Sequence, residues 1–246
     1  MPRQHRAFSY ESRPRVLCRL CQRLAPSRQV RMKIAVLGTG SVGRALAGRL
    51  AELGHDVTVG TRDPGATSAK EEYAGWAADH PDVGLATFGA AAADAELLVN
   101  ATSGGVSLEV LAQAGDLTGK VLLDVSNGLD FSRGFPPLIS APQDDSIAEQ
   151  IQRAHPGARV VKSLNTMTAD LMVHPEQLSD PGSVFVSGDD PDAKQTVTGL
   201  LHDLGHTDVV DLGDVTTARG AEWLMPAWLR VMGAVGTPLF NWKVVR

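Results

Sequence analysis

The chain has 246 residues, 43% of them hydrophobic and 21% charged, with a formal net charge of −5. This composition is typical of a globular protein with a full hydrophobic core, and no apolar run approaches the roughly 20 residues that cross a bilayer. The first residues also lack the apolar core of a secretory signal, so we expect a cytoplasmic protein without a membrane partner.

Residues 1–31 differ in composition from the rest of the chain. They hold eight arginines against one acidic residue, whereas residues 32–246 carry 15 basic and 27 acidic side chains and should repel nucleic acid. We interpret 1–31 as a disordered basic extension, although an Arg-rich, acid-poor leader is also typical of an organelle-targeting peptide. Cys18 and Cys21 form a lone Cys-x-x-Cys pair, without the second pair that a four-ligand zinc site needs.

Residues 33–43 contain a glycine motif in a strand-to-helix context. Four apolar residues lead into Gly-x-Gly-x-x-Gly, and apolar residues then recur at three- and four-residue spacing. This pattern predicts a strand, a turn at Gly38, an approach for a pyrophosphate at Gly40, and close helix packing at Gly43. The first N–H groups of the helix would face the phosphates. The predicted cofactor-binding residues of this loop are Gly38, Thr39, Gly40, Ser41, Val42 and Gly43.

A second predicted strand, at residues 56–60, ends at the residues that select the cofactor. In NAD sites an acidic residue about 20 positions beyond the glycines binds the ribose 2′-hydroxyl, whereas a 2′-phosphate needs a cation and hydroxyl donors. Here the strand leads into Thr61 and Arg62. Arg62 can form two charge-assisted hydrogen bonds to a phosphate, and Thr61 can add a hydroxyl donor. We therefore predict NADP, with Asp63 in the NAD role as the alternative.

The middle of the chain alternates strands and helices, which predicts an α/β fold of the Rossmann type with a doubly wound, mostly parallel sheet. Ligands of such sheets lie outside the carboxyl ends of the strands, so the loops there should face the cofactor. The predicted strands are 83–87, 96–100, 121–125 and 158–163, and the predicted helices are 69–78 and 108–114. The predicted cofactor-binding residues on these loops are Asn100, Ala101, Thr102, Ser103, Ser126, Asn127 and Asn165.

These loops carry no recognisable catalytic set. Neither a Ser-His-acid arrangement, nor paired carboxylates, nor a cluster with metal-ligand spacing can be placed on them, so we predict no catalytic side chain and no metal. Lys162 and Asn165 resemble the lysine and asparagine of the β-hydroxyacid dehydrogenases, whose lysine is the acid/base catalyst, but their spacing differs by one residue. Four histidines stand beside Gly or Pro in predicted turns, where we expect surface residues: His55, His80, His155 and His206.

The last third of the chain is predicted to close the site. A strand at 183–187, a helix at 191–204, a strand at 207–210 and a helix from 215 to about 231 follow in order. The tail is rich in aromatic residues, which we interpret mainly as core or dimer contacts. The alternative is that some form an apolar wall for a planar second substrate. The residues predicted to contact that substrate are Thr166, Met225 and Trp228.

Three stretches of the chain resemble the coenzyme F420-dependent NADP oxidoreductases of archaea and actinobacteria. They are residues 32–62, with the glycine loop and the Thr-Arg pair, residues 161–166 (Val-Lys-Ser-Leu-Asn-Thr) and residues 219–224 (Arg-Gly-Ala-Glu-Trp-Leu). The similarity covers residues 32–246. It implies a Rossmann NADP-binding domain at 32–165, a smaller C-terminal lobe at 166–246 and a homodimer.

The resemblance also implies a reaction, in which a hydride passes between NADP(H) and coenzyme F420, an 8-hydroxy-5-deazaflavin. Direct transfer between two stacked rings needs no side-chain nucleophile, which agrees with the missing catalytic set. One alternative is an NADPH-dependent reductase of another small acceptor: an imine, a carbonyl, a flavin or ferric iron. The other is a non-catalytic sensor, which would bind NADPH without consuming it.

Overall fold

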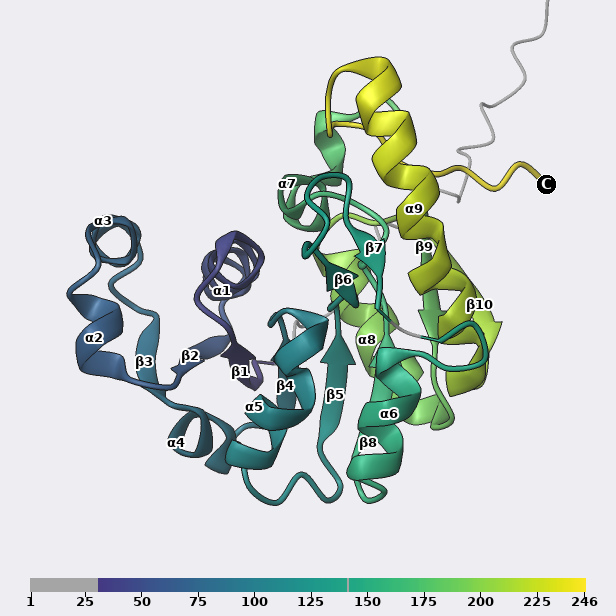
Figure 1. Ribbon diagram of the computed structural model, residues 1–246. Coiled ribbons are helices and arrows are strands. Elements are labelled where there is room, and N and C mark those ends of the chain that lie inside the picture. Colours follow the sequence, from purple (N-terminus) through teal and green to yellow (C-terminus); the bar gives the residue numbers. More distant parts are fainter. Residues whose placement is uncertain (1–30, 141) are drawn as a thin grey trace, which may run out of the picture. The chain divides into compact units, whose positions relative to one another are not determined.

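An eight-stranded sheet forms the centre of the fold in the computed structural model, which describes residues 31–140 and 142–246 (Figure 1). The strands are β1 (Lys33–Leu37), β2 (Asp56–Thr61), β3 (Gly84–Thr87), β4 (Leu97–Asn100), β5 (Val121–Asp124), β8 (Arg159–Lys162), β9 (Ser183–Ser187) and β10 (Asp208–Gly213). Their order is β10-β9-β8-β5-β4-β1-β2-β3. The strands from β8 to β3 in this order are parallel, whereas β9 is antiparallel to β8 and parallel to β10. The predicted Rossmann-type, mostly parallel sheet is confirmed.

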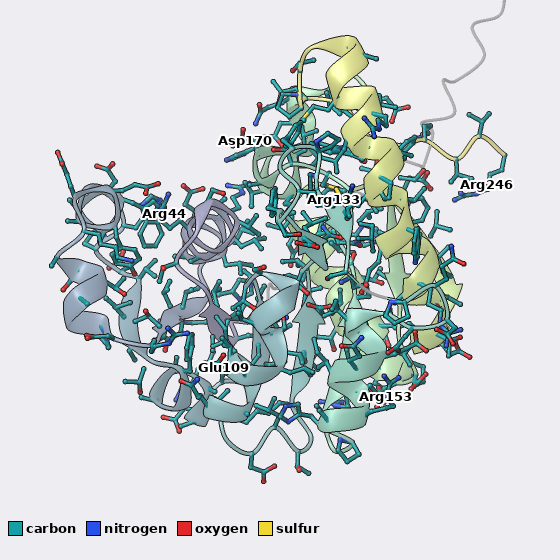
Figure 2. All side chains as sticks on the ribbon, viewed as in Figure 1. Arg44, Glu109, Arg133, Arg153, Asp170 and Arg246 are labelled. Atoms are coloured by element: carbon teal, nitrogen blue, oxygen red, sulfur yellow. The ribbon has the colours of Figure 1, made fainter. Side chains whose placement is uncertain are left out.

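Helices cover both faces of this sheet, with side chains between the layers (Figure 2). They are α1 (Ser41–Glu52), α2 (Pro64–Ser68), α3 (Glu71–Asp79), α4 (Phe88–Ala93), α5 (Ser107–Gln113), α6 (Ile147–Ala154), α7 (Ala169–Val173), α8 (Pro191–Asp203) and α9 (Ala218–Val235). Successive side chains of a strand point to opposite faces. In β1, Ile34 and Val36 therefore join a core with α1, α7 and α8, while Ala35 and Leu37 join a second core with α4, α5 and α6. This double layer makes the sheet doubly wound.

The segment between β5 and β8 contains elements that the sequence analysis does not predict. A hairpin of β6 (Leu129–Asp130) and β7 (Leu138–Ile139) precedes α6. Strands of two residues are too short to show an alternating pattern. The start of α6 does carry a readable signal, because Ser146 caps the helix by accepting a hydrogen bond from the N–H of Glu149. Most of the other boundaries agree with the predicted ones to within three residues.

The expectation that the turn histidines lie at the surface is wrong for two of them. His55 and His206 are buried, and the ring of His206 bonds the carbonyl oxygen of Met172. Burial lowers the pKa of both side chains. Each of these two buried rings bonds a backbone group, since the Nδ1 atom of His55 also accepts a hydrogen bond from the N–H of Met32.

Residues 31–246 form one compact unit, and the sheet continues from β8 into β9 and β10. The domain boundary at residue 165 stays a prediction. Residues 1–30, which include Cys18 and Cys21, lie outside the described residues. In the part of the chain that the structure describes, no helix is long and apolar enough to span a membrane.

Candidate active site

The three glycines of the motif, two between β1 and α1 and one in the first turn of α1, occupy different environments. Gly38 has a φ of +126°, and a Cβ there would lie 2.6 Å from the carbonyl oxygen of Ala101. A Cβ at Gly43 would overlap the carbonyl of Gly38. At Gly40, by contrast, an added Cβ would meet no protein atom within 4 Å. Packing therefore requires glycine at positions 38 and 43. No side chain caps the N-terminus of α1, so the open space at Gly40 leaves room for a phosphate beside the free N–H groups of this helix.

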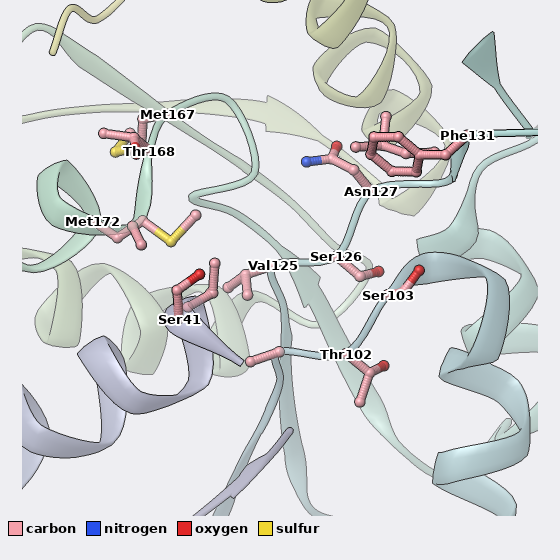
Figure 3. A pocket seen from close by; sticks show the side chains of 14 residues that line it. Ser41, Thr102, Ser103, Val125, Ser126, Asn127, Phe131, Met167, Thr168 and Met172 are labelled. Atoms are coloured by element: carbon pink, nitrogen blue, oxygen red, sulfur yellow. The ribbon is translucent and has the colours of Figure 1, made fainter. Parts of the chain in front are cut away.

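A cavity of about 380 Å³ lies beside this loop, at the carboxyl ends of β1, β4, β5 and β8 (Figure 3). Open α/β sheets bind their ligands at this position. Seven of the predicted cofactor-binding residues line the cavity: Ser41, Val42, Ala101, Thr102, Ser103, Ser126 and Asn127. Apolar side chains that the sequence analysis did not assign complete much of the wall: Val125, Leu129, Phe131, Met167 and Met172. The cavity thus joins polar loop atoms to an apolar surface, as a site for a planar ring requires.

Asn100 does not reach this cavity, although it was predicted to bind the cofactor. Its side chain is fully buried and donates to Ser107 Oγ over 2.9 Å and to Asp124 Oδ1 over 2.8 Å. Its side-chain oxygen, Oδ1, accepts a hydrogen bond of 2.6 Å from the hydroxyl of Thr102, which does line the cavity. Asn100 therefore supports the loop beneath the site.

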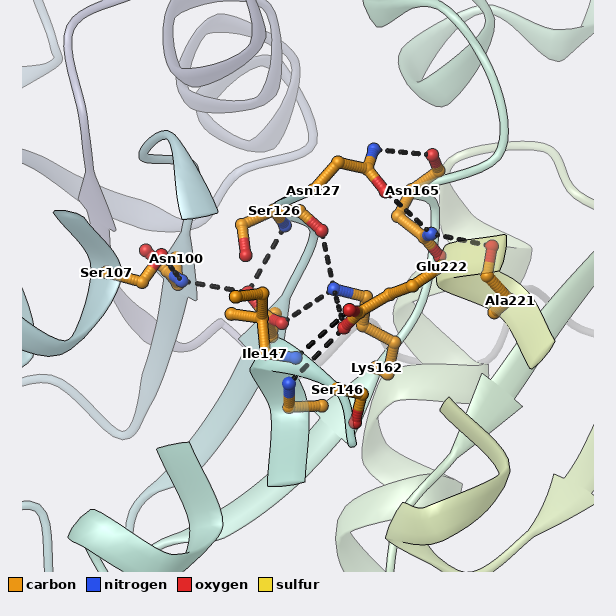
Figure 4. Close-up of polar contacts among 12 residues, drawn as sticks. Asn100, Ser107, Ser126, Asn127, Ser146, Ile147, Lys162, Asn165, Ala221 and Glu222 are labelled. Carbon is orange, nitrogen blue, oxygen red and sulfur yellow. Dashed lines mark hydrogen bonds and ion pairs between the residues drawn. The ribbon is translucent and has the colours of Figure 1, made fainter. Parts of the chain in front are cut away.

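Asn127 and Asn165 are paired with each other. Asn127 Nδ2 donates to the carbonyl oxygen of Asn165 over 2.8 Å, and Asn165 Nδ2 donates to Asn127 Oδ1 over 3.0 Å and to the carbonyl of Ala221 over 3.1 Å. Asn127 lines the cavity, whereas Asn165 is buried behind it. The pair joins the loops after β5 and β8 to the first turn of α9 (Figure 4).

The residues predicted to select the cofactor differ in their freedom to bind a ligand. The Arg62 side chain is 71% exposed, and its Nη2 atom lies 3.6 Å from Glu109 Oε1 on α5. The hydroxyl of Thr61 is already paired with that of Thr67, at 2.8 Å. Asp63 caps α2 by accepting a hydrogen bond from the N–H of Ala66. Of these three residues, Arg62 thus has an exposed side chain that hydrogen-bonds no other described residue, whereas Thr61 and Asp63 hydrogen-bond neighbouring groups.

Three residues predicted to contact the second substrate lie behind the cavity wall. Thr166 is buried, and neither it nor Met225 nor Trp228 lines the cavity. Met225 and Trp228 form a separate apolar cluster with residues of the β6–β7 hairpin, in which the ring of Trp228 stacks on Phe240. The residue after Thr166, Met167, does line the cavity, and its place in the same loop is the signal that could have identified it.

Behind the cavity wall, a buried ion cluster joins β5, β8 and α9 (Figure 4). Lys162 Nζ lies 2.8 Å from Asp124 Oδ2 and 2.9 Å from Glu222 Oε1, and it donates a hydrogen bond of 2.5 Å to the carbonyl oxygen of Ser126. Burial acts to lower the pKa of Lys162, but the two carboxylates outweigh it and raise that pKa. The ammonium group therefore stays charged with its three protons engaged. The Lys162 side chain has no exposed surface and does not line the cavity.

Comparisons with known proteins identify a family to which the chain is similar. Residues 33–128 match the family of coenzyme F420-dependent NADP oxidoreductases. A crystal structure of a candidate F420-dependent NADP reductase from Arthrobacter sp. FB24 is 57% identical to the chain. That similarity covers 87% of this chain and 100% of the other, with a TM-score of 0.86.

Two more distant relatives have different lengths. The F420-dependent NADP reductase of Methanocaldococcus jannaschii is 27% identical over 205 residues, which cover 79% of this chain and 90% of that protein. Metalloreductase STEAP3 of Rattus norvegicus is 30% identical over 202 residues, which cover 80% of this chain. The chain spans 38% of the length of that metalloreductase.

Proposed function

Since the chain belongs to the coenzyme F420-dependent NADP oxidoreductase family, we propose that it transfers a hydride between NADP(H) and the deazaflavin coenzyme F420. The observation that carries the proposal is the 57% identity to the Arthrobacter structure over that structure's whole length. The open space at Gly40 and the cavity beside it are compatible with a dinucleotide, because they offer helix N–H groups and then a partly apolar wall.

The glycine loop and Arg62 would hold the phosphates of NADP(H). The N–H groups at the start of α1 would bind the pyrophosphate above Gly40, and the exposed guanidinium of Arg62 would bind the 2′-phosphate. The remaining predicted cofactor-binding residues belong to this proposal in two groups. Ser41, Val42, Ala101, Thr102, Ser103, Ser126 and Asn127 would contact the ligand, and Thr61, Asn100 and Asn165 would support the surrounding loops.

The cavity would receive the two rings between which the hydride moves. When bound, the nicotinamide supplies the hydride chemistry itself. The chain would hold the rings in contact between the strand-end loops and exclude water with side chains such as Phe131, Met167 and Met172. None of these side chains needs to give a proton to C5 of the deazaflavin, because the hydride from C4 of the nicotinamide would supply that hydrogen.

A second candidate function is NADPH-dependent reduction of another acceptor, such as ferric iron. The 30% identity to the rat metalloreductase favours it, but the chain spans 38% of that protein. The F420-dependent reductase of M. jannaschii matches over 90% of its own length, which favours the deazaflavin as acceptor. The homodimer and the cytoplasmic location remain part of the proposal, and sedimentation of the purified chain would test the first.

Turnover with isotopically labelled cofactor tests the proposed reaction. NADPH deuterated on one face of C4 should deliver its label to C5 of the deazaflavin, and NADPH deuterated on the other face should not. Hydrogen from solvent at C5 would exclude direct transfer between stacked rings. Parallel assays with a flavin, ferric iron and an imine provide the comparison: turnover with one of these and none with the deazaflavin would refute the proposal.

A further inference from the structure

The backbone of Ser126 is held on both sides by the buried ion cluster. Its N–H donates to Asp124 Oδ1 over 3.2 Å, and its carbonyl oxygen accepts from Lys162 Nζ over 2.5 Å (Figure 4). Asp124 and Lys162 are themselves paired, with no exposed side-chain surface. Because a displaced Ser126 would leave one proton of the buried Lys162 ammonium group without an acceptor, this residue is fixed more firmly than a loop residue usually is.

The hydroxyl of Ser126 is the group of this residue that the protein leaves unpaired. It is buried, it belongs to a residue that lines the cavity, and it has no hydrogen-bond partner among the described residues (Figure 3). Buried side-chain hydroxyls are normally hydrogen-bonded. The next residue, Asn127, already uses its amide group on Asn165. An unpaired hydroxyl in a fixed wall suits a ligand that supplies the missing partner.

Stability alone is a weak explanation of the ion cluster. Asp124, Lys162 and Glu222 together carry one excess negative charge, which is offset where Glu222 accepts hydrogen bonds from the N–H groups of Ile147 and Ala148 at the start of α6. Well-packed apolar residues in place of a buried ion cluster are often equally stable or more so. What an apolar residue could not do is hold the carbonyl of Ser126.

We propose that Lys162 is a positioning residue, which holds Ser126 so that its hydroxyl contacts the nicotinamide half of bound NADP(H). Lys162 does not line the cavity and acts through the carbonyl group of Ser126. The carboxamide of the nicotinamide offers both a donor and an acceptor to the hydroxyl. The inference rests on the proposed function in that NADP(H) is the ligand, but it does not depend on which acceptor takes the hydride.

Binding measurements with two ligands test this inference. One ligand is NADPH, and the other is adenosine 2′,5′-bisphosphate, which lacks the nicotinamide half. Ser126→Ala should weaken NADPH binding about 2- to 12-fold, the value of one hydrogen bond, and leave the bisphosphate unchanged. Lys162→Met should lower the affinity for NADPH by at least as much as Ser126→Ala does, and it should also leave the affinity for the bisphosphate unchanged. In the double variant the two losses should not add, because both changes remove the same contact.

Ser146→Ala is the matched control. Ser146 is fully buried and caps α6 next to the same cluster, but its hydroxyl bonds Glu149 and not Ser126. This change should lower the melting temperature and leave the affinity for both ligands unchanged. If Lys162→Met does not fold, Asp124→Asn takes its place, since it keeps the size of the side chain and removes the carboxylate that faces Lys162.

Two results would overturn the inference. Unchanged NADPH affinity in Ser126→Ala would show that the hydroxyl makes no contact with the nicotinamide half. Equal losses for both ligands in Lys162→Met, or losses that add to those of Ser126→Ala, would show that Lys162 acts on the fold as a whole. Neither result bears on turnover with the deazaflavin, and a chain that binds NADPH without reducing the deazaflavin would leave the binding test intact.

Discussion

The two ends of the candidate site both contain a cation beside a carboxylate, but in opposite surroundings. Arg62 and Glu109 are 71% and 61% exposed and lie 3.6 Å apart, whereas Lys162 and Asp124 have no exposed surface and lie 2.8 Å apart. An exposed ion pair such as Arg62–Glu109 contributes about 0.2–1 kcal/mol to the stability of a folded protein. Removing one partner of a buried pair lowers that stability by about 3–5 kcal/mol. A ligand can therefore replace Glu109 beside Arg62, but no ligand can replace Asp124 beside Lys162. The exposed pair can exchange its carboxylate for a ligand, whereas the buried pair holds the residues around it in place.

Gly40→Val should have the largest effect of these substitutions, and it should change cofactor binding without changing stability. The backbone of Gly40 is extended, with φ −73° and ψ −178°, and a Cβ there would meet no protein atom within 4 Å, so valine should be accepted without strain. Its side chain would instead occupy the place of the pyrophosphate. We expect NADPH and NADH binding to fall below detection by calorimetry, with the melting temperature nearly unchanged. If the variant still bound both cofactors, the pyrophosphate would not lie at Gly40.

Lys162→Met should do the reverse and act first on stability. It leaves Asp124 and Glu222 buried without their cation, so the free energy of unfolding should fall by about 3–5 kcal/mol in denaturant titration. Arg153→Met, which breaks a pair with Asp145 whose side chains are 60% and 20% exposed, is the comparison and should cost about 1 kcal/mol or less. Equal losses in the two variants would contradict the distinction between buried and exposed pairs.

Arg62→Ala should change binding by a smaller and more selective amount. If Arg62 holds the 2′-phosphate by charge-assisted bonds, the loss should be about 1.5–3 kcal/mol, or roughly 10- to 150-fold in NADPH affinity. NADH, which lacks that phosphate, should bind almost as before. An equal loss for both cofactors would place Arg62 on the part that they share.

Glu109→Gln should produce the smallest effect and the opposite sign. The carboxylate lies beside the guanidinium that would bind the 2′-phosphate, so its removal should tighten NADPH binding about two- to five-fold, the size of an exposed ion pair. The gain should shrink at high salt, because exposed charges are screened. Binding of NADH serves as the internal control and should not change. Weaker NADPH binding would mean that Glu109 orients Arg62 and does not compete with the phosphate.

The parts of the site that could be predicted from the sequence are those encoded in short stretches. The glycine loop needs only residues 33–43, and the loops after β4 and β5 follow from the alternation of strands and helices. The role of Asn100 could not be predicted, because an asparagine at a strand end looks the same whether it faces a ligand or bonds Asp124 beneath. The ion cluster joins Lys162 to Glu222, 60 positions later, and no local pattern marks that pairing. Phe131 was missed because it lies between β6 and β7, and the strands of this hairpin have only two residues each.

The hydrogen bonds at the start of α9 have a consequence for the order in which the chain becomes structured. Glu222 bonds Ile147 and Ala148, and Asn165 bonds Ala221, across separations of 56 to 75 residues. During synthesis, all strands from β1 to β8 are present in the chain while these contacts are still missing, because α9 is the last described helix to be made. The wall formed by Ser126 and Asn127 is completed only when α9 arrives. Cofactor binding should therefore be among the last properties that the growing chain acquires.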